Sequence, residues 1–209
     1  MEEKYEFPTE EVTLPSKGLL YPEESGLRSG IIQMKYMTAK EEDILTNVNF
    51  IRNGTAIDKL LQAMIKSPIN YNDLLVGDKN AILVAARILG YGNDYTFKAI
   101  HPETGVEEEL NADLTTLKDI VLDETLIKDG KNEFEFTLPI SKTKLTFKLL
   151  THGDENNIEQ ELKGLKKINA NATPELTTRL KHTILSVNGN YKQQTIRQFV
   201  DQRLLARDS

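Results

Sequence analysis

The chain has 209 residues and no cysteine, which excludes disulfides, thiol catalysis and thiolate metal sites. Its 32 acidic residues outnumber its 26 Lys and Arg residues and give a formal net charge of −6. An acidic chain without a basic stripe argues against nucleic acid as a partner, because neutralisation of phosphates supplies most of that affinity.

The N-terminal part, residues 1–93, predicts two strands followed by three helices. Val12 and Leu14 indicate a short strand before a turn-rich loop, and the alternation from Ile32 to Tyr36 indicates a second strand. The helices are expected at residues 38–51, at residues 55–67 and at residues 78–89. An acidic N-terminus without an apolar run predicts no signal peptide, so we expect an intracellular protein.

Capping signals mark the first two of these helices. Thr38 is followed three residues later by Glu41, which is the pattern of a capping box. Thr55 and Asp58 repeat the pattern with an acid in place of the usual Glu or Gln. Pro68 is expected to end the second helix, because proline cannot continue one.

The third helix, residues 78–89, is the most apolar stretch of the chain. Beyond Ala81 its one polar residue is Arg87, which predicts a helix buried on most sides. Asp78 is expected as its N-cap, and Gly90 as the left-handed residue at which the chain leaves it. A run of about a dozen residues is too short to span a membrane.

The middle of the chain, residues 94–150, predicts an antiparallel β-rich lobe inserted between helical parts. Apolar residues alternate on both sides of the turn at residues 101–105, and again on both sides of the turn at residues 139–141. Each pattern is typical of a β-hairpin. Residues 111–131 fit either a short helix or a packed loop.

The last part, residues 151–209, predicts helices that pack with residues 1–93. The first of them begins at Thr151, which has Asp154 three residues later as a capping partner. The second begins around Pro174, at the tolerated N1 position.

Two apolar stripes predict the last two helices of this part. One continues the helix that begins at Pro174 through Ile184 to Val187. The other covers about residues 192–206. The whole chain is thus predicted to be α+β: a mainly helical body of about six helices with an N-terminal strand region and the inserted antiparallel lobe.

No combination of residues indicates a reaction class. His101, His152 and His182 each lack a second ligand at the spacing of a metal site. The adjacent carboxylates of residues 107–109 would alternate between the two faces of a strand, so they are not a catalytic pair. We therefore expect no enzymatic activity, no metal and no cofactor.

The candidate contact residues are a charged residue on the apolar helix, a loop and the last helix. Arg87 requires a carboxylate partner or access to solvent, or else it anchors an interface. The loop and the last helix are candidates because unusual turns and terminal helices often dock partners; the alternatives are a surface turn and a helix facing its own core. Their residues are Leu14, Lys17, Tyr21, Phe199 and Leu204.

Three segments together resemble a known family. They are Leu14–Tyr21, Met37–Leu45 and Asp73–Ile82. In this order and spacing they are similar to the baseplate hub assembly proteins of contractile-tailed bacteriophages of the T-even type. Shorter similarities lie at residues 138–139, 149–154 and 187–189.

The resemblance implies a non-enzymatic late phage protein that acts through protein–protein contacts. It would be a hub assembly factor or a minor hub subunit, with other baseplate hub proteins as partners and the tape-measure protein as a further candidate. It would act in the host cytoplasm during assembly and either leave or remain in the tail baseplate. The alternatives are a tail-assembly chaperone for the tape-measure protein and a hub-associated cell-wall hydrolase.

The resemblance also concerns the turn at residues 101–105. Relatives often place paired cysteines there, forming a metal knuckle, whereas this chain reads His101-Pro102-Glu103-Thr104-Gly105. The hairpin must therefore be held by strand pairing and packing alone.

Overall fold

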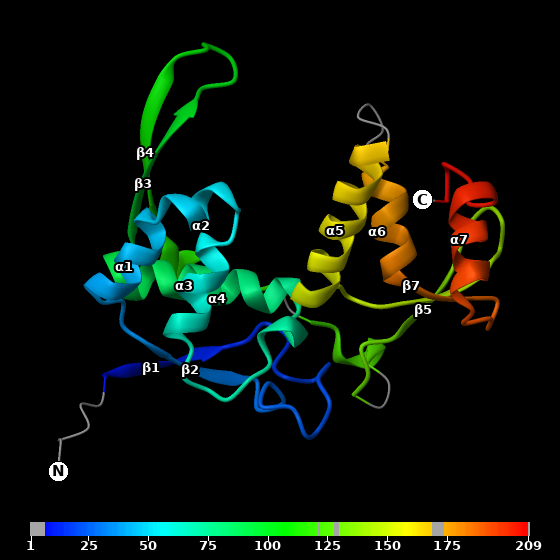
Figure 1. Ribbon diagram of the computed structural model, residues 1–209, viewed down its shortest axis with the longest axis horizontal. Helices are drawn as coiled ribbons and strands as arrows, with labels where there is room; N and C mark the ends of the chain where they lie inside the picture. The colour runs from blue at the N-terminus through cyan, green and yellow to red at the C-terminus, as the bar shows by residue number, and fades with distance from the viewer. Residues whose placement is uncertain (1–6, 121, 128–129, 169–173, 209) are drawn as a thin grey trace. The chain divides into compact units, whose positions relative to one another are not determined.

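The computed structural model describes residues 7–120, 122–127, 130–168 and 174–208. Over these residues the protein is α+β, as predicted, with seven α-helices and three small antiparallel sheets (Figure 1). The chain forms two compact units, each made of segments far apart in the sequence. Unit 1 comprises Met1–Gly18, Ser29–Ile69 and Gly77–Leu122, and unit 2 comprises Leu19–Arg28, Asn70–Val76 and Asp123–Ser209. The division at residues 93 and 150 stays a prediction.

Unit 1 begins with the two predicted strands. β1 (Thr9–Thr13) pairs antiparallel with β2 (Ile31–Lys35). Ile32 and Met34 are fully buried, which confirms the alternation. Tyr36, the third residue of the pattern, lies beyond the end of β2 and is exposed.

The single helix expected at residues 38–51 is wrong, because two helices occupy this segment. α1 (Ala39–Thr46) ends at Asn47, whose backbone is extended and whose side chain caps α2 (Val48–Arg52). Val48 and Ile51, expected on the buried face of one helix, are exposed on α2. The capping capacity of Asn47 thus outweighs the continuity of the apolar stripe.

α3 (Ala56–Met64) buries the apolar face that its spacing predicts. Thr55 occupies its N-cap position, but the Thr55 side chain makes no capping hydrogen bond. The helix ends at Ile65, which bridges to Met34 of β2, ahead of Pro68. Pairing with a strand, and not the proline, therefore ends this helix.

α4 (Val76–Tyr91) is longer than predicted at both ends. It begins before Asp78, so this residue lies in the first turn and the predicted N-cap is wrong. Gly90 is helical, and Gly92, with φ of 82°, is the left-handed residue, so the predicted stop is also wrong. Gly90 packs against Met37, where a Cβ would lie 2.7 Å from the Met37 Cε. Gly90 therefore lies inside the helix, in contact with the flexible Met37 side chain, and does not mark the helix end.

The expectation that α4 is buried on most sides holds only in part. Ile82 and Ala86 are buried, but Leu83 and Tyr91 are exposed and the other apolar residues are half-buried. None of the described helices combines the length and the apolar character that crossing a membrane needs.

Asp78 joins α4 to the loop that follows β1. Its carboxylate, 1% exposed, accepts hydrogen bonds from the Ser16 backbone N–H at 2.9 Å and from the Ser16 hydroxyl at 2.6 Å. A carboxylate in the first turn also interacts favourably with the helix dipole. The buried charge is thus satisfied by a loop 62 residues away in sequence.

A second buried charge pair lies at the end of β2. Lys35 Nζ is 2.7 Å from Glu41 Oε1, and both side chains are almost fully buried. Thr38 donates its N–H and its hydroxyl to Glu41 Oε2, at 3.2 and 2.6 Å. The predicted pairing of Thr38 with Glu41 at the start of α1 is therefore confirmed.

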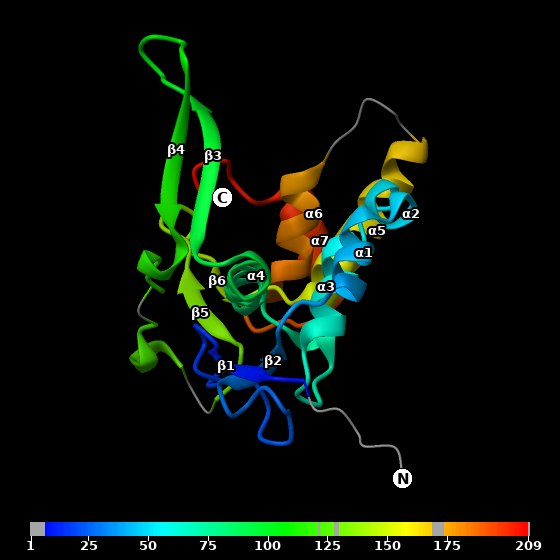
Figure 2. The ribbon, with the colours of Figure 1, turned by 90° about the vertical axis from the view of Figure 1, so that its left-hand side faces the viewer.

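The hairpin predicted around residues 101–105 is confirmed. β3 (Asp94–Ile100) pairs antiparallel with β4 (Glu107–Asp113), and Phe97 lies opposite Leu110. Within unit 1 the hairpin leaves the end of α4 and extends beyond α1, α2 and α3 (Figure 2). The ambiguous segment after it forms short 3-10 turns at Leu114–Thr116 and Glu124–Leu126, while Val121 lies outside the described residues.

Unit 2 contains a three-stranded sheet in the order β5–β6–β7. β5 (Phe134–Thr137) and β6 (Lys144–Phe147) are the strands of the second predicted hairpin. β7 (Ile184–Val187) was expected to be helical, and this prediction is wrong. Pairing with β6 satisfies the backbone of this short apolar run, whose state periodicity alone does not decide.

The helices of unit 2 are α5 (His152–Ile168), α6 (Glu175–Thr183) and α7 (Gln193–Gln202). Thr151 and Asp154 exchange hydrogen bonds at the start of α5, which confirms that cap. Pro174 is the N-cap of α6, not its N1 residue; Thr173 lies outside the described residues.

Removal of the Asp78 carboxylate should destabilise the protein strongly. We expect Asp78→Ala to lower the free energy of unfolding by about 3 kcal/mol, since hydrogen bonds to a charged group are worth roughly 1.5–3 kcal/mol each. Ser16→Ala should cost about 1–2 kcal/mol, because only the hydroxyl bond is lost. Denaturant unfolding measures both. The exposed Asp43 on α1 is the control, and an Asp78→Ala effect no larger than that of Asp43→Ala would contradict this role.

The Lys35–Glu41 pair predicts a pH-dependent stability. Burial raises the pKa of Glu41, but hydrogen bonds from Lys35 and Thr38 and the charge of Lys35 outweigh it and lower this pKa from 4.5 to about 2. The stabilisation is complete above pH 4.5 and is lost as the pH falls toward 2.

Glu41→Gln should therefore destabilise the protein by about 3 kcal/mol at neutral pH, because Lys35 stays buried without its counter-charge. The difference from wild type should shrink below pH 4.5. Unfolding midpoints across this pH range measure it. For the exposed control Glu24→Gln the difference should stay flat, and a flat difference for Glu41→Gln would rule out the pair as the cause.

Candidate interaction surface

The β3–β4 hairpin presents an aromatic and aliphatic face to solvent. Tyr95 and Phe97 are stacked side by side, with ring centroids 5.8 Å apart. Leu110 lies opposite Phe97, and all three side chains are about 40% exposed (42%, 37% and 42%). An antiparallel pair normally packs one face on a core, so this face is available for a partner.

Arg87 fixes the base of this hairpin. Its guanidinium donates to the carbonyl oxygens of Gly92 at 3.0 Å and Asp94 at 3.2 Å. It also lies over the rings of Tyr91 and Tyr95, at 5.0 and 5.6 Å from their centroids. These carbonyl and ring contacts take the place of the carboxylate partner that the sequence suggested. Arg87 thus orients the hairpin on α4, and a direct contact with a partner stays a proposal.

The loop with Leu14 and Lys17 is held by close backbone packing within unit 1. Leu14 is fully buried, and its N–H donates to the Gly30 carbonyl at 2.8 Å. Lys17 is exposed with φ of 52°, and a Cβ on Gly30 would lie 2.5 Å from the Lys17 carbonyl carbon. In this loop, the charged side chain of Lys17 is therefore better placed for an outside contact than that of Leu14.

Tyr21 is a buried residue of unit 2. It is 3% exposed, and its hydroxyl accepts a hydrogen bond from the Leu75 N–H at 2.9 Å. Its side chain therefore holds the segment before α4 in place. A partner role for Tyr21 stays a proposal.

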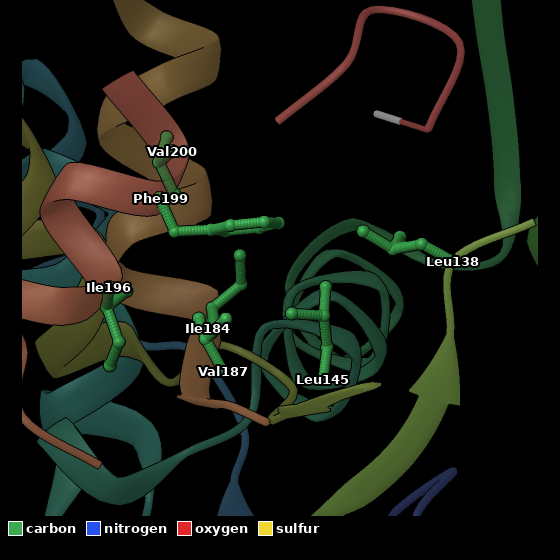
Figure 3. Packing of buried hydrophobic residues seen from close by; sticks show 7 residues of the cluster. All are labelled: Leu138, Leu145, Ile184, Val187, Ile196, Phe199 and Val200. Atoms are coloured by element: carbon green, nitrogen blue, oxygen red, sulfur yellow. The ribbon is translucent and has the colours of Figure 1, made fainter. Parts of the chain in front are cut away.

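The apolar stripe of α7 completes the core of unit 2. Phe199 is 5% exposed, and its ring extends from α7 past Ile184 toward Leu138 (Figure 3). Leu204 is half-buried against the same cluster. The cluster consists of Leu138, Leu145, Ile184, Val187, Ile196, Phe199 and Val200. This placement fits the alternative of a core-facing helix.

Each of the three histidines contacts another residue of the protein. His101 Nδ1 accepts from the Glu103 N–H at 3.3 Å in the hairpin turn. His152 is buried edge-on to Tyr71, with ring centroids 4.8 Å apart, and His182 Nε2 lies 3.0 Å from Glu161 Oε2. In the part of the chain that the structure describes, no three His, Asp or Glu residues are placed to hold a metal ion.

The exposed hairpin face is the feature that the choice of candidate residues missed. The sequence contained its signal, because the hairpin was predicted and Tyr95 and Phe97 alternate on one face. What periodicity could not show is that the core of unit 1 leaves this face uncovered.

The fold and its surfaces define a small α+β protein with an uncovered apolar hairpin, the kind of surface used in protein assemblies. The family model described as T4 bacteriophage base plate protein matches residues 8–203, so the chain belongs to this family of phage baseplate proteins. The tail of the phage particle is the location that this family indicates, and other baseplate proteins are the partners. No curated protein and no solved structure matches the chain.

Loss of the Arg87 guanidinium should loosen the hairpin without unfolding α4. We expect Arg87→Met to speed amide hydrogen exchange in β3 and β4 by about tenfold, since it removes two hydrogen bonds to backbone carbonyls. Exchange in α3 should not change. Lys98→Met is the control: it breaks an exposed ion pair with Glu107 and should change exchange by less than about twofold. Equal exchange in wild type and Arg87→Met would contradict the positioning role.

Proposed function

We propose that this protein is a hub assembly factor or a minor hub subunit of a contractile-tail baseplate and that it acts through protein–protein contacts. The observation that carries the proposal is the family match over residues 8–203, which includes segments of both units. Membership of a baseplate family supports an assembly role better than a catalytic one. The three similar segments noted in the sequence support the hub in particular.

The structure adds two supporting features. The apolar residues of α7 are used inside unit 2, whereas those of the β3–β4 hairpin remain exposed. A surface of this kind favours association with another protein when it is available. The protein would meet its partners in the host cytoplasm, where tails are assembled.

Fractionation of infected cells tests the proposal. A phage that produces the chain with an affinity tag is used, and assembly intermediates and finished particles are separated by sedimentation. We expect the tagged chain to sediment with baseplate hub intermediates. Its presence in finished particles as well would identify a hub subunit, and its absence from them would identify an assembly factor.

Three outcomes would contradict the proposal. The chain could be missing from intermediates and particles alike. It could be bound to the tape-measure protein without any hub protein, which would identify a tail-assembly chaperone. The purified chain could also produce a clear band on a cell-wall zymogram, which would identify a hydrolase.

A further inference from the structure

The β3–β4 hairpin carries most of the net charge of the chain. Between Asp94 and Asp113 there are six acidic residues and one lysine, a formal charge of −5 out of −6 for the whole chain. Three of the acids are consecutive, Glu107 to Glu109, at the start of β4. The remaining residues sum to a formal charge close to zero, so the hairpin concentrates acidic charge in 20 residues.

The two faces of the hairpin differ in whether their side chains have partners across the strands. On one face, Thr96 donates its hydroxyl to Asn111 Oδ1, and Lys98 Nζ lies 2.8 Å from Glu107 Oε1. On the other face lie the exposed Tyr95, Phe97 and Leu110. The polar face is thus paired across the strands, whereas the apolar side chains of the other face are exposed among the described residues.

The register of the hairpin shows which backbone groups point outward. At the turn His101 donates its N–H to the Val106 carbonyl, and at the base Leu114 donates to the Asn93 carbonyl, both at 2.9 Å. Hydrogen-bonded and non-hydrogen-bonded residue pairs alternate in an antiparallel ladder. The residue pairs of the apolar face, such as Phe97 with Leu110, are therefore the hydrogen-bonded pairs, whose backbone groups point toward the partner strand of the hairpin.

The alternation also shows which backbone groups lie on the outer edge of β4, the edge away from β3. Glu107, Glu109 and Asn111 belong to the other set of pairs, so their N–H and C=O groups point away from β3. Every residue of β4 is exposed. Over the described residues β4 pairs with β3 alone. An open edge of this kind can accept a further strand.

We propose that the outer edge of β4 binds an extended segment of another protein in which basic and apolar residues alternate. Its backbone would pair with Glu107, Glu109 and Asn111. Its Lys or Arg side chains would lie on the face of Glu107 and Glu109, and its apolar side chains would widen the face of Phe97 and Leu110. This proposal rests on the proposed function, since it names the partner chemistry of a protein that acts by contacts.

Charge selects this occupant over the other candidates. A second copy of the hairpin would bring another charge of −5 and place acid beside acid, which destabilises strand pairing. Nucleic acid would be repelled for the same reason. A free two-stranded hairpin is also marginally stable, so a third strand that extends the apolar face stabilises it.

The acidic residues Glu107 to Glu109 on this edge strand have one competing explanation. Charged residues on an edge strand are a common protection against unwanted pairing. In that case the edge would reject every strand, basic ones included. The two explanations therefore predict opposite results for a basic strand.

The test uses the full chain, labelled for NMR, and synthetic peptides. The probe is a peptide with the length of β4, seven residues, in which Lys and Val alternate. We expect saturable changes in the amide signals of β4. A Glu–Val peptide should not bind, and a Lys–Val peptide N-methylated at alternate residues should bind about tenfold more weakly, since it cannot complete the ladder.

Charge reversal tests the same edge from the side of the protein. The double variant Glu107→Lys with Glu109→Lys should bind the Lys–Val peptide about tenfold more weakly. The double variant Glu23→Lys with Glu24→Lys is the matched control, because it changes the net charge equally at exposed residues outside the hairpin. The control should bind within about twofold of wild type, because it leaves the carboxylates of β4 unchanged. Unchanged signals from α4 show that each variant is folded.

Several results would overturn the proposal. They are no binding of the Lys–Val peptide, equal binding of the N-methylated peptide, and signal changes confined to β3. The infected-cell fractionation separates this failure from failure of the proposed function. If wild type and the Glu107→Lys, Glu109→Lys variant enter hub intermediates equally, the edge proposal fails while the hub function stands; if wild type does not enter them, the hub function itself fails.

Discussion

The hydrogen bonds between Asp78 and Ser16 are the constraint on which unit 1 depends. A carboxylate buried to 1% exposure is tolerable only with donors, and Ser16 supplies two of them. The loop after β1 and the first turn of α4 must therefore form together. Once α4 is fixed, the hydrogen bonds from Arg87 to Gly92 and Asp94 hold the start of the β3–β4 hairpin to the helix.

The two units use their apolar residues differently, and this difference bears on function. In unit 2 the stripe of α7 faces inward, and Phe199 fills the core beside Ile184. In unit 1 the apolar face of the hairpin stays in solvent beside a concentration of acidic charge. A baseplate protein must hold its own fold and still offer a surface to its neighbours, and this division of apolar residues meets both needs.

Much of the fold could be predicted because its signals are local. The caps at Thr38 and Thr151 and both hairpins depend on residues within a few positions of one another. The division of residues 38–51 into two helices has a local cause, the Asn47 cap, but two other errors occur where distant residues compete with local patterns. Asp78 has the position of a cap in sequence but binds Ser16, and the run from Ile184 to Val187 pairs with β6 although its spacing also fits a helix.

The sequence by itself determined the class of fold, the acidic hairpin and the resemblance to phage baseplate proteins, since these depend on residue order and composition alone. Only the tertiary structure decided which apolar faces are covered, because burial depends on contacts between segments far apart in the chain. Phe199 was thereby assigned to a core, and Tyr95 and Phe97 to a surface. The partners of Arg87 also required the structure: they are backbone carbonyls of Gly92 and Asp94, five and seven residues away, and sequence spacing does not show which carbonyls a guanidinium reaches.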